Sequence, residues 1–224
     1  MKIKCLDQGI VELINNTPNG DLLVVNAARC SFDKQHEVFI HPSDTKLVNY
    51  LAKHKHVLPF RHPSATLRIV APLFVLRQLG KHQIGFSWSE VSRRYISDDP
   101  KFHTPKGCWR EASNDVKQGS SSAYINSESA FVTDDMLNEH YKNSMRVYKY
   151  FLQSDICPEQ ARMILPQSMY STTVTTATLL GWHHLYTLRT EEHTQQETRE
   201  YAKAVGEIMS TIFPYSWRAL CEPS

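Results

Sequence analysis

Apolar residues recur at helical spacing in several parts of the chain. The clearest case is residues 135–154, where five apolar residues lie three or four positions apart: Leu137, Tyr141, Met145, Tyr148 and Leu152. This spacing predicts an amphipathic helix, because it places all five on one helical face. Similar patterns predict helices at residues 22–29, 43–55, 73–80 and 158–165, from about 179, and at 195–213. Asp21 is the predicted N-cap of the first of these.

Alternating or β-branched segments predict the strands of a sheet. Residues 2–15 alternate loosely on either side of a turn sequence, which is typical of two short strands. Residues 64–70 alternate as far as Pro72, and residues 168–178 are rich in Thr, Tyr and Val. Predicted strands and helices are interspersed, with neither a repeat nor an interdomain linker. We therefore expect one α+β domain over residues 1–224, with a central sheet flanked by helices.

Residues 96–135 depart from both patterns. They are mostly polar, contain the sequences DDP and GSSS, and show little periodicity. A stretch of this length without regular structure is typical of a functional lid or a disordered segment. We expect a mobile loop insertion that lies near the functional site.

The composition narrows the class of protein. The formal net charge is +2, whereas nucleic-acid-binding proteins usually have a strong basic excess, so we expect no nucleic-acid partner. Five scattered cysteines without a C-x-x-C spacing argue against a disulfide framework and a cysteine zinc site. No signal-peptide region and no apolar run of transmembrane length occur. We expect a cytoplasmic protein without a membrane partner.

The segment RQLGKHQIGFSWSEVSRRY at residues 77–95 concentrates polar chemistry. One acid, Glu90, is interleaved with cationic, hydroxyl and aromatic side chains: Arg77, Lys81, His82, Arg93, Arg94, Ser87, Ser89, Ser92, Phe86 and Trp88. Cationic side chains bind phosphate or carboxylate through charge-assisted hydrogen bonds. Arg162 and Arg189 add cations in apolar surroundings, where burial is costly unless an anion is met. The pattern indicates an anionic, partly aromatic ligand such as a nucleotide; the alternative is a solvated helix face with internal ion pairs.

Several other chemistries lack their sequence signatures. There is no G-x-G-x-x-G, Walker or G-x-S-x-G motif, so sites of those types are not expected. His54, His56 and His62 lie close together in sequence, but no carboxylate or cysteine stands at ligand spacing, so no metal site is expected. His82 is the nearest base to Ser92 in sequence. We favour a ligand contact over a nucleophile for Ser92, and both remain open.

Six motifs, in order along almost the whole chain, resemble those of the flavin-dependent thymidylate synthases. They are AARCSF (27–32), HVLPFRH (56–62), APLFVLRQ (71–78), the central motif (77–95), ARMILP (161–166) and LRTEEHTQ (188–195). KHQ-x-G followed by EVSRRY is similar to phage-type members, for which the location would be the host cytoplasm. The resemblance implies reductive methylation of dUMP to dTMP, with the carbon from methylenetetrahydrofolate and the hydride from NADPH through FAD. It also implies a homotetramer whose active sites are shared between subunits.

The resemblance assigns roles to individual positions. Those that match dUMP-contacting positions are Gln78, Lys81, Glu90, Ser92, Arg93, Arg94, Arg162 and Arg189. Those that match FAD-contacting positions are Ser31, His56, Lys81, His82, Gln83, Ser89, Glu90, Thr178, His184, His193 and Gln195. Arg189 matches the arginine that stabilises the anionic pyrimidine ring, so Arg189 and Ser92 are the candidate catalytic residues. Arg94 and Arg162 would neutralise the nucleotide phosphate.

The central motif departs from the family pattern at flavin positions. Lys81, His82 and Gln83 stand where the family has Arg-His-Arg, and eight residues rather than seven precede Ser92. Lysine keeps one charge but loses the guanidinium fork, and Gln83 loses its charge. The departures keep two alternatives open. One is a relative that hydroxymethylates dUMP or dCMP with the same folate carbon, and the other is a non-catalytic nucleotide- or RNA-binding protein without flavin.

Overall fold

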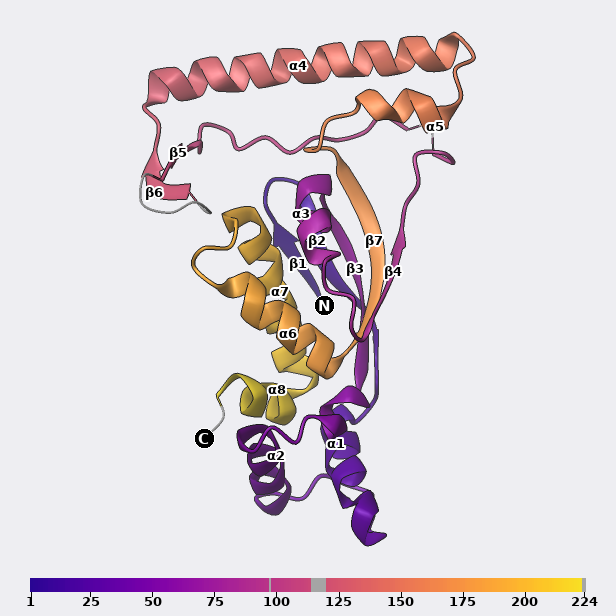
Figure 1. Ribbon diagram of the computed structural model, residues 1–224, viewed down its shortest axis with the longest axis vertical. Coiled ribbons are helices and arrows are strands. Elements are labelled where there is room, and N and C mark those ends of the chain that lie inside the picture. The colour runs from indigo at the N-terminus through magenta and orange to yellow at the C-terminus, as the bar shows by residue number, and fades with distance from the viewer. Residues whose placement is uncertain (97, 114–119, 223–224) are drawn as a thin grey trace.

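A five-stranded antiparallel sheet forms the centre of the computed structural model, which describes residues 1–96, 98–113 and 120–222 (Figure 1). The strands lie in the order β1 (Lys2–Cys5), β2 (Gly9–Asn16), β3 (Ser64–Pro72), β7 (Tyr170–Thr178) and β4 (Phe86–Glu90). Every neighbouring pair is antiparallel. The predicted α+β class is confirmed, and the late strand β7 separates β3 from β4.

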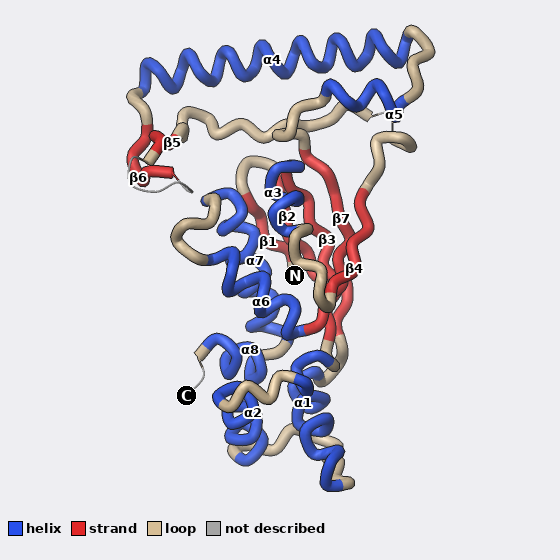
Figure 2. The backbone as a smooth tube through the Cα atoms, in the orientation of Figure 1, coloured by secondary structure: helices blue, strands red, loops and turns tan. Residues whose placement is uncertain are grey.

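Helices cover one face of the sheet and both of its ends (Figure 2). Those on the face are α3 (Leu73–Leu79), α6 (Leu179–Thr190) and α7 (Gln196–Ile212). Those at one end are α1 (Gly20–Arg29), α2 (Ser43–Lys53) and α8 (Pro214–Cys221), with the short turns η1 (Cys30–Phe32) and η2 (Leu58–Arg61). Those at the other end are α4 (Ser127–Gln153), α5 (Pro158–Ala161) and η3 (Arg162–Ile164). No helix among the described residues is both long and apolar enough to cross a membrane.

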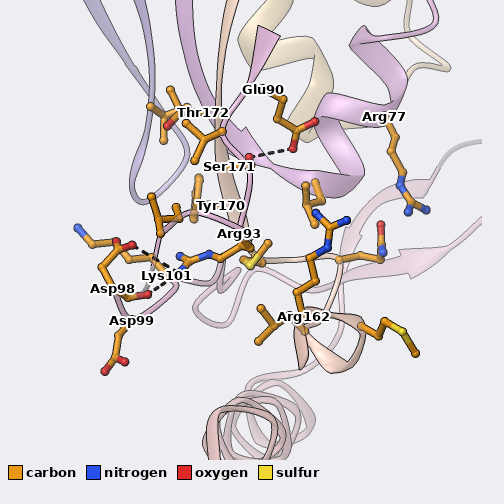
Figure 3. A pocket seen from close by; sticks show the side chains of 18 of the residues that line it. Arg77, Glu90, Arg93, Asp98, Asp99, Lys101, Arg162, Tyr170, Ser171 and Thr172 are labelled. Atoms are coloured by element: carbon orange, nitrogen blue, oxygen red, sulfur yellow. Dashed lines mark hydrogen bonds and ion pairs between the residues drawn. The ribbon is translucent and has the colours of Figure 1, made fainter. Parts of the chain in front are cut away.

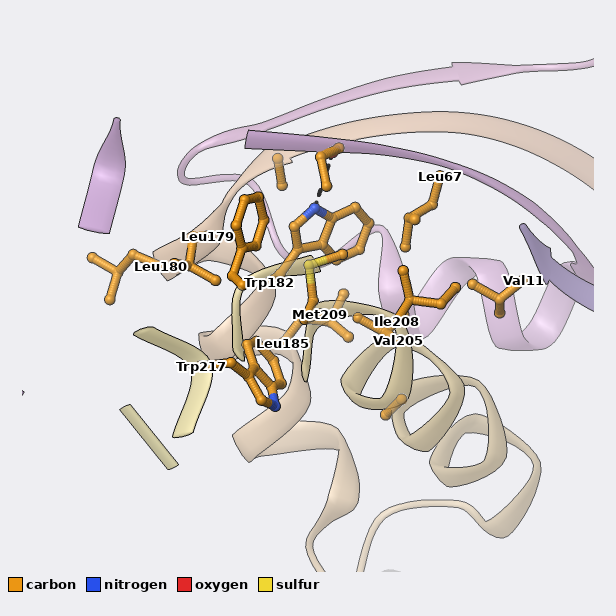
Figure 4. Packing of buried hydrophobic residues seen from close by; sticks show 14 of the residues in the cluster. Val11, Leu67, Leu179, Leu180, Trp182, Leu185, Val205, Ile208, Met209 and Trp217 are labelled. Carbon is orange, nitrogen blue, oxygen red and sulfur yellow. Dashed lines mark hydrogen bonds between the residues drawn. The ribbon is translucent and has the colours of Figure 1, made fainter. Parts of the chain in front are cut away.

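The main core lies between the sheet and helices α6 and α7. Alternation along β3 buries Leu67 and Ile69 on the face that these helices cover, as expected for a strand with one buried face. Trp182 of α6 is fully buried beside Met209 of α7, and its indole nitrogen donates a hydrogen bond to the Ala65 carbonyl at 3.0 Å (Figure 4). Burial of these large side chains holds the helices on the sheet.

Helix α4 begins eight residues earlier than predicted, at Ser127 rather than 135. The Asn126 side chain accepts a hydrogen bond from the Ser129 amide at 2.8 Å and caps the first turn. Phe131 and Val132 in this part of the helix are exposed. The apolar pattern did not extend to the true start because these side chains do not face a core.

The segment expected to be a mobile insertion, residues 96–135, contains regular structure. It includes the two-stranded hairpin of β5 (Arg110–Ala112) and β6 (Ser120–Tyr124) and the first turns of α4. A single bridge between Phe102 and Met169 joins the segment to the residues before β7. Residues 97 and 114–119 of this insertion lie outside the described residues, and its mobility stays a prediction.

Asp21 does not cap the helix that it was predicted to start. Helix α1 begins two residues earlier than predicted, at Gly20, so Asp21 lies within it, and no side chain caps it. The Asp21 carboxylate instead accepts hydrogen bonds from the amides of Tyr215 at 3.3 Å and Ser216 at 2.8 Å, in the first turn of α8. Asp21 therefore satisfies free amides of a helix that the sequence pattern did not predict.

Candidate active site

A cavity of about 530 Å³, here called the cationic cavity, lies where β4 and β7 meet the α5 end of the molecule (Figure 3). Its charged lining comes from four parts of the chain: Arg77, Glu90, Arg93, Asp98, Asp99, Lys101, Glu159 and Arg162. Of the predicted dUMP positions, Glu90, Arg93 and Arg162 line it. A cluster of this kind offers both charge-assisted donors and carboxylate acceptors to one ligand.

Strand pairing places Glu90 at the edge of this cavity. β4 pairs with β7 in a register that sets Glu90 opposite Thr173, and the pairing continues as the Val91 amide donates to the Thr172 carbonyl at 2.9 Å. The Ser171 hydroxyl then donates to Glu90 Oε1 at 2.9 Å. One carboxylate oxygen of Glu90 is thereby held, and the other remains for a ligand donor.

Arg162 is the first residue of η3, the turn that follows the Pro158-initiated helix α5. Its side chain is exposed and makes no ion pair with the described part of the chain. Figure 3 shows it extending toward the side of the cavity where Arg77 and Glu90 lie. Its guanidinium is therefore available to an anion.

Arg93 has a different role from the other cations in this motif. It is only 8% exposed, and its guanidinium donates to the Asp98 carbonyl and, at 3.5 Å, to the Asp98 carboxylate. These contacts join the end of the central motif to the segment that follows it. Arg93 shapes the cavity wall, and its Nη1 is already engaged by Asp98.

Ser92 and Arg94 lie beside each other at the rim. Arg94 Nε donates to Ser92 Oγ at 3.2 Å, and Arg94 Nη1 lies 3.4 Å from Glu159 of the cavity lining. Nucleophilic activation of Ser92 would require a base. His82, the base closest in sequence, is engaged with Arg189 instead, so the geometry favours a contact role for Ser92.

Gln78, His82 and Arg189 form a second cluster, which does not line the cationic cavity. Arg189 Nε donates to His82 Nε2 at 3.1 Å, and Arg189 Nη2 donates to the Gln78 carbonyl at 3.1 Å. The Gln78 side chain donates to Gln195 and accepts from Thr198 Oγ1 at 3.1 Å. Residues from α3, α6 and α7 are thus joined around one guanidinium.

Burial sets the protonation of this cluster. Burial, followed by the nearby charges of Arg189 and His184, lowers the pKa of His82 to about 4. A neutral imidazole therefore accepts the Arg189 hydrogen bond at physiological pH. Burial also lowers the pKa of Arg189, which Glu191 partly opposes, yet a guanidinium stays charged at neutral pH.

A second cavity, of about 520 Å³, adjoins the first and is here called the aromatic cavity. It shares Leu73, Arg77 and Glu90 with the cationic cavity. The rings of Phe86 and Trp88, both in its lining, stack at 5.6 Å with an angle of 12°. The combination of flat apolar faces with a cation and a carboxylate fits a large ring cofactor with polar edges, so the residues present are compatible with a flavin.

The predicted flavin positions fall into two groups within one chain. Most lie in the α3–β4 turn, on β4, or in and beside α6: Lys81, His82, Gln83, Ser89, Glu90, Thr178, His184, His193 and Gln195. Thr178 uses its hydroxyl to accept from the Gly181 amide at 3.1 Å and so caps α6. Ser31 in η1 and His56 after α2 lie among the helices α1 and α2, beyond the end of the sheet where β7 ends and β4 begins (Figure 1). No hydrogen bond or ion pair among the described residues joins Ser31 or His56 to the first group.

The structure also shows lining residues to which the sequence had assigned no role. Arg77 borders both cavities, and Ser171 orients Glu90. Arg77 was visible as part of the basic segment, but its position between two cavities depends on α3 packing at the sheet edge. Ser171 carried no local signal, because it follows Glu90 by more than 80 residues.

The chain is similar to known proteins over most of its length. Residues 12–215 match the family described as thymidylate synthase complementing protein. Flavin-dependent thymidylate synthases from Kosmotoga olearia and Thermotoga neapolitana are 32% and 31% identical, over 98% of this chain and 93% and 94% of theirs. A crystal structure described as the UMP/dUMP methylase PolB from Streptomyces cacaoi, bound with 5-Br dUMP, matches with a TM-score of 0.85 and 27% identity. That match covers 98% of this chain and 97% of the other. The chain belongs to the thymidylate synthase complementing protein family, and is an enzyme of the flavin-dependent thymidylate synthase type.

Proposed function

We propose that this enzyme reductively methylates dUMP to dTMP, with the carbon from methylenetetrahydrofolate and the hydride from NADPH through FAD. The observation that carries the proposal is the pair of adjoining cavities, one cationic and one aromatic, which share Arg77 and Glu90. A phosphate-bearing nucleotide suits the first and a flat cofactor suits the second. This arrangement would bring the two molecules into contact, as transfer between them requires.

Arg162 and Arg94 would bind the nucleotide phosphate. Arg162 makes no ion pair with the described residues, and Arg94 is paired only with the exposed carboxylate of Glu159 at 3.4 Å. An exposed pair of this kind is weak, so exchanging it for a phosphate costs little. The free oxygen of Glu90 would accept a hydrogen bond from an N–H or hydroxyl of the nucleotide.

Arg189 would stabilise negative charge that develops on the pyrimidine ring. Its hydrogen-bond acceptor, His82, is neutral, so this bond leaves the positive charge of the guanidinium in place. A preorganised cation of this kind lowers the free energy of an anionic transition state. Arg189 does not line the cationic cavity of its own chain. Sites shared between subunits of a homotetramer would account for this separation.

Gln83, which lines the aromatic cavity, and the exposed side chains of Lys81 and His184 would hold FAD. When bound, FAD supplies the two-electron redox chemistry that the side chains lack. Ser31 and His56 would complete its site from another subunit, since no hydrogen bond or ion pair within the described part of one chain joins them to Lys81. We extend the proposal to a cytoplasmic homotetramer that acts on free nucleotides without a nucleic-acid partner.

UMP is a second candidate substrate. The matched PolB structure is described as a UMP/dUMP methylase, and its UMP-analogue complex matches this chain with a TM-score of 0.84. The cationic cavity contains both carboxylates and cations, and hydroxyl groups can bind to either. This observation supports testing a ribonucleotide beside the deoxyribonucleotide.

The test is mass spectrometry of the nucleotide after anaerobic incubation with methylenetetrahydrofolate, FAD and NADPH. dUMP, UMP and dCMP are incubated separately. A methyl-sized gain on dUMP is the expected result, and omission of NADPH or folate should abolish it. A hydroxymethyl-sized gain would replace the proposal with the hydroxymethylating alternative. A flavin-loaded protein that leaves all three nucleotides unchanged would refute it.

A further inference from the structure

A third cavity, of about 340 Å³, lies between α3, the hairpin of β5, and helices α4 and α7, and is here called the α4–α7 cavity. It shares no lining residue with the cationic or the aromatic cavity. Its walls are largely aromatic and apolar, with contributions from Phe74, Trp109, Leu137 and Tyr141. This volume suits a molecule of one or two fused rings.

His103 is the polar residue of greatest interest in this lining. It is 8% exposed, and its Nδ1 lies 2.6 Å from Asp7 Oδ1. The Tyr170 hydroxyl donates to the same oxygen at 2.5 Å. Burial raises the pKa of Asp7, but the hydrogen bonds from Tyr170 and His103 outweigh burial and hold it below its usual value. The ionised carboxylate can only accept, so His103 Nδ1 is the donor.

The other ring nitrogen of His103 has no partner. In a neutral imidazole that donates from Nδ1, Nε2 carries a lone pair and accepts a hydrogen bond. This atom makes no hydrogen bond to any described residue. A bound N–H donor would add a hydrogen bond at this nitrogen. His103 therefore presents one oriented acceptor in the lining of the α4–α7 cavity.

Several other polar groups of the lining are engaged with protein partners, while Ser168 and Gln195 also border the cavity. The Trp109 indole nitrogen donates to Asp134 at 2.7 Å, so its ring offers only its faces. The Tyr141 hydroxyl donates to the His103 carbonyl at 2.6 Å. Arg110 Nη2 donates to both carboxylate oxygens of Glu197, at 2.8 and 3.0 Å. Because Arg110 and Glu197 neutralise each other, neither charge favours an ionic ligand.

We propose that the α4–α7 cavity binds a compact, uncharged heteroaromatic molecule whose ring N–H donates to His103 Nε2. The ring packs against the aromatic lining, where offset or edge contacts with Phe74 and Trp109 stabilise it. The His103 acceptor sets the orientation, and the apolar walls provide the affinity. A ligand of the same shape without the N–H leaves His103 Nε2 unpaired and binds more weakly.

Indole is the test probe, and 1-methylindole is its matched control without the N–H. The protein is labelled with 5-fluorotryptophan and titrated at pH 8, where histidine side chains are generally neutral. Fluorine NMR reports on all four tryptophans separately, at positions 88, 109, 182 and 217. Trp109→Phe assigns the signal from the cavity.

Indole is expected to shift the Trp109 signal and to leave that of Trp88, in the aromatic cavity, unchanged. 1-Methylindole is expected to bind about fivefold more weakly, the effect of one net hydrogen bond. His103→Phe should remove the difference between the two probes. Equal affinities of the two probes, or no shift of the Trp109 signal, would overturn the proposal, and both are measured in the unmutated protein without reference to catalytic activity.

Discussion

Arg189 Nε donates a hydrogen bond to His82 Nε2 at 3.1 Å, so a permanent cation is held by an imidazole whose pKa is lowered to about 4. The bond joins the end of α6 to the turn between α3 and β4. Because the acceptor is neutral, the bond orients the guanidinium without adding a counter-charge. The arrangement suits a residue that must meet negative charge as it develops.

Arg189→Ala is predicted to affect turnover far more than flavin binding. Loss of a preorganised cation should reduce kcat by about 100-fold or more. The dissociation constant of FAD, followed by flavin fluorescence, should change by less than about fivefold, roughly one net hydrogen bond. Arg218→Ala, at an exposed position on α8, is the control and should leave both quantities unchanged. If turnover and FAD affinity fall by similar factors, the proposed role of Arg189 is wrong.

Arg162→Ala is predicted to weaken dUMP binding by about tenfold or more, the cost of losing a charge-assisted hydrogen bond. The exposed side chain makes no ion pair with the described residues, so folding stability should be nearly unchanged. Isothermal titration with dUMP measures the first effect and urea unfolding the second. Uridine, which lacks the phosphate, should bind the variant and the unmutated protein alike. If the variant weakens the binding of uridine as much as that of dUMP, Arg162 does not act on the phosphate.

His82 is predicted to make stability depend on pH between about 4 and 6.5. The folded pKa of about 4 lies below the usual 6.5, so the unfolded chain binds the proton more tightly. The contribution of His82 to stability is complete above pH 6.5 and declines as pH falls toward 4. His183, whose pKa burial also lowers, acts in the same direction. Urea unfolding at pH 4.5, 5.5 and 7 should show that the free energy of unfolding of His82→Asn depends less on pH than that of the unmutated protein. An unchanged pH dependence would contradict the assignment.

Asp44→Asn is predicted to destabilise the fold by about 3 kcal/mol, because it leaves the Arg29 charge without its partner. The fully buried Asp44 carboxylate accepts from Arg29 at 2.6 Å and from the Ile40 amide at 2.8 Å. Glu12→Gln is the matched control, since Glu12 lies 3.5 Å from Arg68 in a partly exposed pair. The control should change the free energy of unfolding by less than about 1 kcal/mol. If the two variants lower the free energy of unfolding by similar amounts, burial does not determine how much the Arg29–Asp44 pair contributes to stability.

Local periodicity predicted most of the elements on which the site is built. Four predicted elements lie close to their expected bounds: the strands at residues 64–70 and 168–178, the helix from about residue 179 and the helix at 195–213. Each of these segments has one face in the core, and a buried face imposes a regular apolar spacing on the sequence. Strand β4 and helix α8 were not predicted. β4 is a sheet edge with mostly exposed polar residues, and α8 is too short to show a clear period.

The chemistry of the central motif was also readable from the sequence, since arginine and lysine carry the same charge in any fold. The partners of these charges were not. Arg93 and Arg162 have the same side chain, yet Arg93 is turned back onto Asp98 while Arg162 faces the cavity. His103 gave no signal in the sequence, and its contact with Asp7 spans 96 positions. Residue type and spacing determined the elements and the class of ligand, whereas long-range packing decided which donors remain free, because that depends on neighbours distant in the sequence.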